Sequence, residues 1–147
     1  MYAQRLMSLN LPVVRPEDSV GKVLRLMDEY KVCHLALVNG EVFAGLIYEE
    51  DLMERDEETP LAAMEARPVS VEPQLHLYDV VSRLVESEVD AMPVVHAGKF
   101  LGCIEPKAVL RFLAKSTHWA GLGAVLVLEV PKNDLSIAEI ARLVEGA

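Results

Sequence analysis

The sequence predicts an α+β protein made of two tandem β-α-β-β-α repeats followed by a C-terminal β-α extension. Two observations carry this prediction. The chain matches itself without a gap at a spacing of 57 residues, and each copy shows one helical and two strand-like apolar patterns in the same order. Nine of 39 aligned positions are identical, where chance would give about two or three. The identical pairs are Val14 and Val71, Pro16 and Pro73, Val23 and Val80, Glu29 and Glu86, Val32 and Val89, Val38 and Val95, Phe43 and Phe100, Gly45 and Gly102, and Ile47 and Ile104.

The first repeat is predicted from its apolar spacing and its turn residues. Apolar positions recur at helical spacing from Val20, after Asp18 or Ser19 as the capping residue. A continuous apolar run, an Asn-Gly turn and a second run then predict a buried hairpin. The expected elements are an extended segment ending at Val14, a helix from Val20 to Tyr30, strands over 33–38 and 42–47, and a charged helix over 49–55.

The second repeat predicts the same series of elements. These are an extended segment ending at Val71, a helix over 77–84, strands over 92–95 and 100–104, and a closing helix over 106–113. The acidic segment 57–60 ends in proline and lacks periodic apolar positions, as expected for a linker. We therefore expect repeats at residues 1–58 and 59–116, with a linker and extension at 117–147.

Composition excludes several classes of protein. The 147 residues suit about one domain, and no uncharged apolar run is long enough to cross a membrane. Fourteen basic and 23 acidic residues give a net charge of −9, which would repel the phosphates of nucleic acids. The N-terminus lacks the pattern of a secretory signal, so we expect a cytoplasmic protein. Cys33 and Cys103 do not align with each other, and a disulfide is not expected.

Residues 6 to 114 resemble the CBS domain family, which occurs as tandem pairs called Bateman modules. The resemblance rests on the element order, found twice, on the strand at 91–95 with its central Pro93, and on the Gly45 to Asp51 run. It implies two repeats packed about a pseudo-twofold axis, with two clefts that bind adenosine-containing ligands in many relatives. Such modules sense ligands and rarely catalyse, so we expect no enzyme activity and no required cofactor.

The resemblance also implies which cleft is competent. In nucleotide-binding relatives an Asp six positions after the glycine holds the ribose hydroxyls, a role that Asp51 can fill and Ala108 cannot. Each cleft borrows a Ser or Thr from the opening strand of the other repeat, three positions before the proline. Ser70 fills that position in one repeat and Val13 in the other. Asp51 and Ser70 are therefore expected in one live cleft, and Val13 and Ala108 in a dead one.

The expected ligand follows from the residues beside Asp51. Tyr48 stands where relatives often have a phosphate-binding Ser or Thr, Glu49 and Glu50 follow it, and no basic residue is visible nearby. Acids beside a phosphate disfavour its binding. AMP, adenosine or the cationic S-adenosylmethionine is thus expected rather than ATP. The resemblance implies that Met92 and Pro93 line the wall for the base.

Ordinary structural roles remain open for the same residues. Asp51 could serve only to stabilise the start of a helix, Ser70 could be a plain strand hydroxyl, and Met92 and Pro93 could be core residues. Cys33 and the histidines lack partners at the spacing that a nucleophile or a metal site needs. The alternative function is therefore a dimerising interaction module with two vestigial clefts. A homodimer, and a protein that the module regulates, are expected partners in either case.

The tail predicts one strand and one helix. The strand is expected over 124–130 and the helix around Ile137, Ile140 and Val144. This unit resembles the start of an ACT-type ligand-binding domain, which follows the pair in some relatives. A complete ACT domain needs a β-α-β-β-α-β set, and here the chain stops after one β-α unit.

Overall fold

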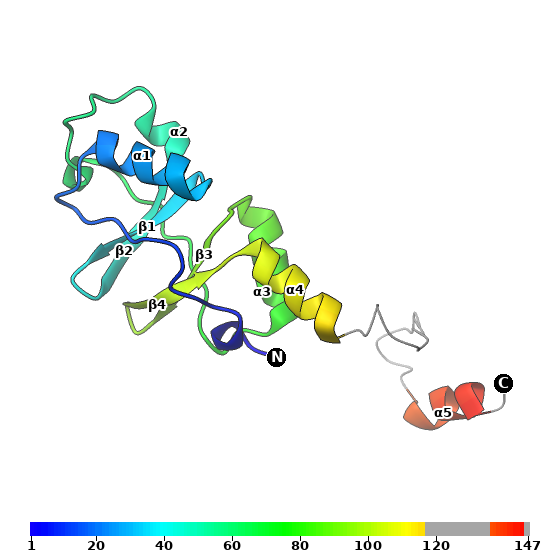
Figure 1. Cartoon of the computed structure of the whole chain (residues 1–147). Coiled ribbons are helices and arrows are strands. Elements are labelled where there is room, and N and C mark those ends of the chain that lie inside the picture. Colours follow the sequence, from blue (N-terminus) through cyan, green and yellow to red (C-terminus); the bar gives the residue numbers. More distant parts are fainter. Residues whose placement is uncertain (117–135, 146–147) are drawn as a thin grey trace. The chain divides into compact units, whose positions relative to one another are not determined.

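The computed structural model describes residues 1–116 and 136–145, and the chain divides into two compact units at 1–116 and 117–147 (Figure 1). The elements of the first unit are the short 3-10 helix η1 (Ala3–Arg5), α1 (Val20–Tyr30), β1 (His34–Asn39), β2 (Val42–Tyr48), α2 (Glu49–Leu52), η2 (Leu61–Ala63), α3 (Leu77–Ser87), β3 (Met92–His96), β4 (Lys99–Ile104) and α4 (Pro106–Ser116). The second unit contains α5 (Ile137–Glu145), which confirms the predicted helix. The strand predicted over 124–130 lies outside the described residues.

The repeated order of elements is confirmed, with one helix shorter than expected. α1 begins where the Ser19 hydroxyl accepts a hydrogen bond from the Lys22 backbone N–H at 3.4 Å. α2 ends at Leu52, although the charged pattern predicted a helix to residue 55. Leu52 is fully buried, while the next apolar residue, Met53, is 73% exposed. Residues 53–58 are all exposed, so no buried face continues the helix beyond Leu52.

The two hairpins form one four-stranded antiparallel sheet in the order β1-β2-β4-β3. They join at their tips, where Phe43 N–H donates to the Gly98 carbonyl at 2.9 Å and Phe100 N–H donates to the Glu41 carbonyl at 3.0 Å. These two bonds connect equivalent positions of the two repeats. The contact between the hairpins therefore follows the pseudo-twofold relation between the repeats that the resemblance implies.

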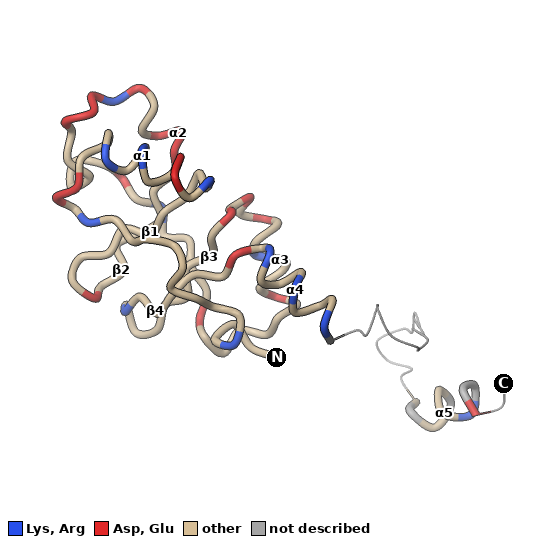
Figure 2. Tube along the Cα trace, viewed as in Figure 1, with Lys and Arg blue, Asp and Glu red and all other residues tan. Residues whose placement is uncertain are grey.

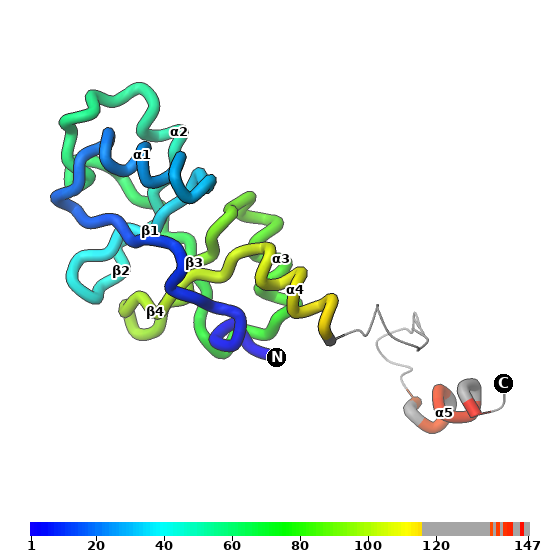
Figure 3. Tube along the Cα trace, in the orientation of Figure 1, coloured from blue at the N-terminus to red at the C-terminus, as the bar shows by residue number. Residues whose placement is uncertain are grey.

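The segments that lead into the repeats are exchanged between them. We call residues 3–8 the first lead-in and residues 61–67 the second lead-in. Ala3 of the first lead-in donates its N–H to the Leu75 carbonyl in the second repeat, and Leu61 of the second lead-in donates to the Asp18 carbonyl in the first, both at 2.9 Å. Ala3 and Leu61 are fully buried. In Figure 3 the blue N-terminal segment runs beside the green and yellow second repeat. Each repeat thus completes its core with chain that precedes the other.

This exchange brings the second lead-in against β2. Arg67 N–H donates to the Leu46 carbonyl at 2.9 Å, and Leu46 N–H donates to the Arg67 carbonyl at 2.8 Å. The approach depends on Gly45, because a Cβ at that position would lie 2.5 Å from the Ala66 Cβ. Gly45 also has a φ of +144°, which side chains rarely adopt. Arg67 is therefore fixed by its backbone next to the end of β2.

Candidate functional site

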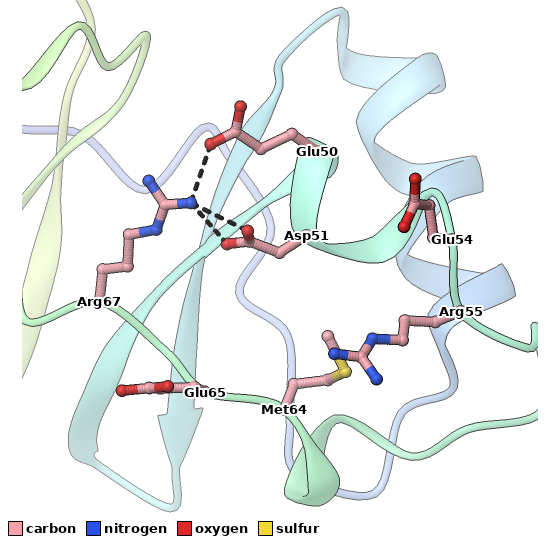
Figure 4. Close-up of a pocket in the computed structure, with 7 residues that line it drawn as sticks. All are labelled: Glu50, Asp51, Glu54, Arg55, Met64, Glu65 and Arg67. Atoms are coloured by element: carbon pink, nitrogen blue, oxygen red, sulfur yellow. Dashed lines mark hydrogen bonds and ion pairs between the residues drawn. The ribbon is translucent and has the colours of Figure 1, made fainter.

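The cleft at Asp51 is a hollow of about 740 Å³ beside the end of β2 (Figure 4). The side chain of Asp51 is 37% exposed, and it stands in the single turn of α2 that follows β2. The residues that line the hollow come from α2, from the segment after it and from the second lead-in. They are Glu50, Asp51, Glu54, Arg55, Met64, Glu65 and Arg67. Both repeats therefore supply walls to the hollow, as the exchange of lead-ins requires.

Arg67 holds the carboxylate of Asp51. Its Nη2 donates to both Asp51 oxygens, at 2.9 and 2.8 Å, and to Oε1 of Glu50 at 2.8 Å, as Figure 4 shows. These hydrogen bonds raise the pKa of Arg67 above its ordinary high value, and the bond to Glu50 has the larger effect. The expectation that this cleft lacks a basic residue is wrong. Arg67 lies 16 residues from Asp51 in the sequence, and only the exchange of lead-ins brings the two together.

Tyr48 lies under the same guanidinium. The Arg67 guanidinium carbon is 3.8 Å from the centroid of the Tyr48 ring, at cation-π distance. The imidazole of His34 meets Tyr48 edge to face, with centroids 4.4 Å apart. Tyr48 is only 8% exposed between these neighbours. Tyr48 and Asp51, two of the predicted site residues, are therefore joined through Arg67.

A contact between the repeats continues this chain of side chains. Oδ1 of Asp90 lies 2.7 Å from Nδ1 of His34, and Oδ2 of Asp90 accepts the Cys33 N–H at 2.7 Å. The pKa of Asp90 is lowered, because these hydrogen bonds outweigh the effect of partial burial, which alone would raise it. The ionised carboxylate can only accept, so the His34 proton sits on Nδ1. Cys33 and Asp90 occupy equivalent positions in the two repeats, so their contact lies near the pseudo-twofold axis.

A second hollow of about 420 Å³ adjoins the first. It is lined by Cys33, His34, Tyr48, Glu49, Glu50, Met53, Arg67, Ser87 and Glu88. Glu50 and Arg67 line both hollows, so their side chains form the partition between them. The Cys33 thiol in the second hollow has a raised pKa, chiefly through its hydrogen bond to Glu49, and is not an activated nucleophile.

The other predicted site residues lie away from these hollows. Ser70 is exposed, and Met92 is fully buried in the core of the second repeat. Pro93 is buried, and its carbonyl accepts the Val71 N–H at 2.9 Å. None of the three lines either hollow. Their roles toward a ligand stay predictions.

The equivalent place in the second repeat has a different chemistry. Glu105 occupies the position of Tyr48, Lys107 that of Glu50 and Ala108 that of Asp51. Glu105 is 7% exposed and is the only buried charged residue in the part of the chain that the structure describes. Its carboxylate pairs with the Lys107 ammonium at 2.5 Å. Ala108 therefore offers no carboxylate at the position where Asp51 stands in the first repeat.

Acidic side chains dominate the surface around the cleft. Figure 2 marks the acidic positions in red along α2 and the segment that follows it. In the sequence these positions are Glu49, Glu50, Asp51, Glu54, Asp56, Glu57 and Glu58. No group of three or more His, Cys, Asp or Glu within residues 1–116 and 136–145 has the arrangement of a metal site. Within the same ranges, no helix is long and apolar enough to cross a membrane.

Comparison with known families decides what this arrangement is. The CBS domain family model matches residues 3–58 and again residues 61–115. The chain belongs to the CBS domain family. CBS pairs are regulatory modules, and the two matches coincide with the two structural repeats.

Solved structures with similar folds are CBS pairs. A CBS domain pair/ACT domain protein from Thermotoga maritima has a TM-score of 0.71 at 18% identity, covering 79% of this chain and 98% of that one. CBSX2, solved in complex with AMP, has a TM-score of 0.69 at 24% identity, covering 80% of this chain and 98% of that one. At these identities the likeness establishes the fold.

A curated relative is also matched. An uncharacterized 33.4 kDa protein in the ribosomal RNA operon of Thermofilum pendens is 27% identical over 130 residues, covering 76% of this chain and 43% of the relative. The CBS pair described here thus spans less than half of that relative.

Proposed function

We propose that this CBS pair is a ligand-sensing regulatory module that binds one adenosine-containing small molecule in the cleft at Asp51. AMP, adenosine and S-adenosylmethionine are the candidate ligands, rather than ATP. The observation that carries the proposal is the Asp51 carboxylate in a hollow of about 740 Å³ whose walls come from both repeats. A ligand that contacts both walls favours some arrangements of the two repeats over others, and a partner protein can recognise the favoured arrangement.

The chemistry of the cleft supports a ribonucleoside. A carboxylate with two oxygens can accept from the two neighbouring hydroxyls of a ribose at once. Tyr48 lines the adjoining hollow, where Arg67 covers its aromatic face, and stacking on aromatic rings is how proteins commonly hold bases. The AMP complex of CBSX2, a protein of the same fold, supports this choice of ligand class.

The charge of the cleft disfavours ATP. Four carboxylates, of Glu50, Asp51, Glu54 and Glu65, face two guanidinium groups, of Arg55 and Arg67. A triphosphate would bring about four more negative charges into a cleft that is already net negative, and like charges repel more strongly when partly desolvated. A nucleoside with one phosphate, with none, or with a cationic sulfonium meets less repulsion.

A second candidate function is dimerisation without ligand sensing. Tyr78 and Val85 on α3 are each 72% exposed, which is unusual for large apolar residues seven positions apart on one helix. The equivalent positions on α1 are Gly21 and Asp28. A homodimer built through the α3 side of the second repeat would cover these two side chains.

Two measurements separate these functions. In a thermal-shift series, AMP, adenosine or S-adenosylmethionine should raise the melting temperature of the wild-type chain, because a ligand that binds only the folded state stabilises it. Asp51→Ala should abolish the shift, while Asp28→Ala, the same change at a side chain that is 83% exposed, should retain it. A dimer in sedimentation velocity with no shift from any of the ligands would favour the second function. Tight binding of ATP would contradict the proposed ligand class.

A further inference from the structure

Arg67 covers both groups that an adenosine ligand would use. Its guanidinium is 3.8 Å from the ring centroid of Tyr48, and its Nη2 lies within 2.9 Å of both oxygens of Asp51. A planar base would stack on the aromatic face, and a ribose diol would hydrogen bond to the carboxylate. The Arg67 guanidinium thus occupies both the place where the base would stack and the place where the ribose would bind.

The hydrogen-bond geometry makes the two occupants compete. A single nitrogen of Arg67 bridges the two Asp51 oxygens from the front of the carboxylate. A cis-diol that donates one hydroxyl to each oxygen approaches from the same direction. The Asp51 carboxylate cannot hold both in this way, so a ribonucleoside must move the guanidinium.

The side chain of Arg67 can leave Asp51 without a change in its backbone. Its backbone is held by two hydrogen bonds to Leu46, whereas its side chain is 42% exposed. Because it forms the partition between the two hollows, its movement would join them into a larger cleft. Glu50, which is 71% exposed and already 2.8 Å from Nη2, can remain its partner after it leaves Asp51.

We propose that Arg67 is a built-in occupant of the ligand site, which a ribonucleoside monophosphate displaces and whose released guanidinium then binds the phosphate. This inference rests on the proposed function and deepens it, because it selects AMP among the three candidates. Guanidinium groups suit phosphate oxygens as well as carboxylates, so the phosphate replaces the partner that Arg67 loses. Adenosine has no such group and must displace Arg67 without compensation.

The test compares adenosine and AMP in calorimetric titrations of the wild type and of Arg67→Met, which keeps a long apolar stem but cannot pair with Asp51. Losing one ion pair and one cation-π contact of ordinary strength should tighten adenosine about tenfold in the variant. AMP gains the same freedom and loses its phosphate contact, so its Kd should change by less than about threefold. The preference for AMP over adenosine should therefore fall about tenfold.

Two further variants keep the outcomes distinct. Arg67→Lys retains the charge without the planar group, and it should keep the AMP preference while still tightening adenosine. Asp51→Ala should abolish binding of both ligands. If Asp51→Ala abolishes binding but adenosine binds Arg67→Met and Arg67→Lys no tighter than wild type, the inference is wrong and the proposed function stands. If neither ligand binds the wild type or either Arg67 variant, both are wrong. If adenosine binds Arg67→Met but does not measurably bind the wild type, the result supports the inference.

Discussion

Removing the Asp90 carboxylate should loosen the contact between the two repeats. Asp90→Ala deletes two short hydrogen bonds, at 2.7 Å each, that join the loop before β3 to Cys33 and His34. Hydrogen bonds to a charged group contribute about 1.5–3 kcal/mol each when buried, and the Asp90 side chain is 35% exposed, so we discount them for solvent screening. The expected loss is about 2 kcal/mol for the pair.

The measurement is urea unfolding of the full chain, followed by a thermal melt. A loss of about 2 kcal/mol in a unit of this size corresponds to a melting temperature lower by about 6–10 °C. Asp28→Ala is the matched control, since Asp28 pairs only with Lys31 at the surface, and its unfolding curve should superimpose on the wild type within error.

The pH dependence gives the same interaction a second signature. The pKa of Asp90 is lowered in the folded state, so its stabilising effect is complete above the unfolded value of about 3.9 and is lost as the pH falls through the lower folded value. The stability difference between wild type and Asp90→Ala should therefore be constant near neutral pH and shrink below about pH 4. An Asp90→Ala variant as stable as the Asp28→Ala control at pH 7 would refute this account of the contact.

Two other predictions concern the backbone and the thiols. Gly45→Ala should destabilise the chain by about 3 kcal/mol or more, because its Cβ would lie 2.5 Å from the Ala66 Cβ at a strained φ. Gly40→Ala, with open space around it, should lose only about 1 kcal/mol. Equal effects of the two substitutions in denaturant unfolding would contradict the close approach of the second lead-in. In maleimide labelling at pH 7.5, Cys33 should react well before Cys103, because Cys103 is 5% exposed and burial raises its pKa to about 12. If mass spectrometry shows that Cys103 is labelled faster, its position in the core is contradicted.

The sequence predicts most of this fold because both repeats bury the same positions. Identical valines at 14 and 71 and at 23 and 80 reveal the duplication. The helical spacing after residue 19 gives both ends of α1, and the spacing after residue 76 gives the start of α3, which runs three residues beyond its predicted end at 84. α2 ends earlier than its charged pattern indicates, since the length of an exposed helix depends on packing that a local pattern does not contain.

The candidate site is predicted less completely, and Arg67 shows why. The glycine-to-aspartate spacing singles out Asp51, but nothing local to it indicates a basic neighbour. The same exchange of segments that suggests Ser70 as a partner also carries Arg67, three residues earlier, to Asp51. A search of the second lead-in for charged residues would have found it. Its pairing with Tyr48 and Asp51 is a tertiary contact that no periodicity encodes.

The most direct test of the central claim is the number of AMP molecules bound per chain in equilibrium dialysis. The account predicts one, because Asp51 supplies a carboxylate at one cleft and Ala108 supplies none at the other. It also predicts that Asp51→Ala binds no AMP while remaining folded by circular dichroism. Two molecules bound per chain, or one still bound by Asp51→Ala, would contradict the claim that this symmetric fold has a single site.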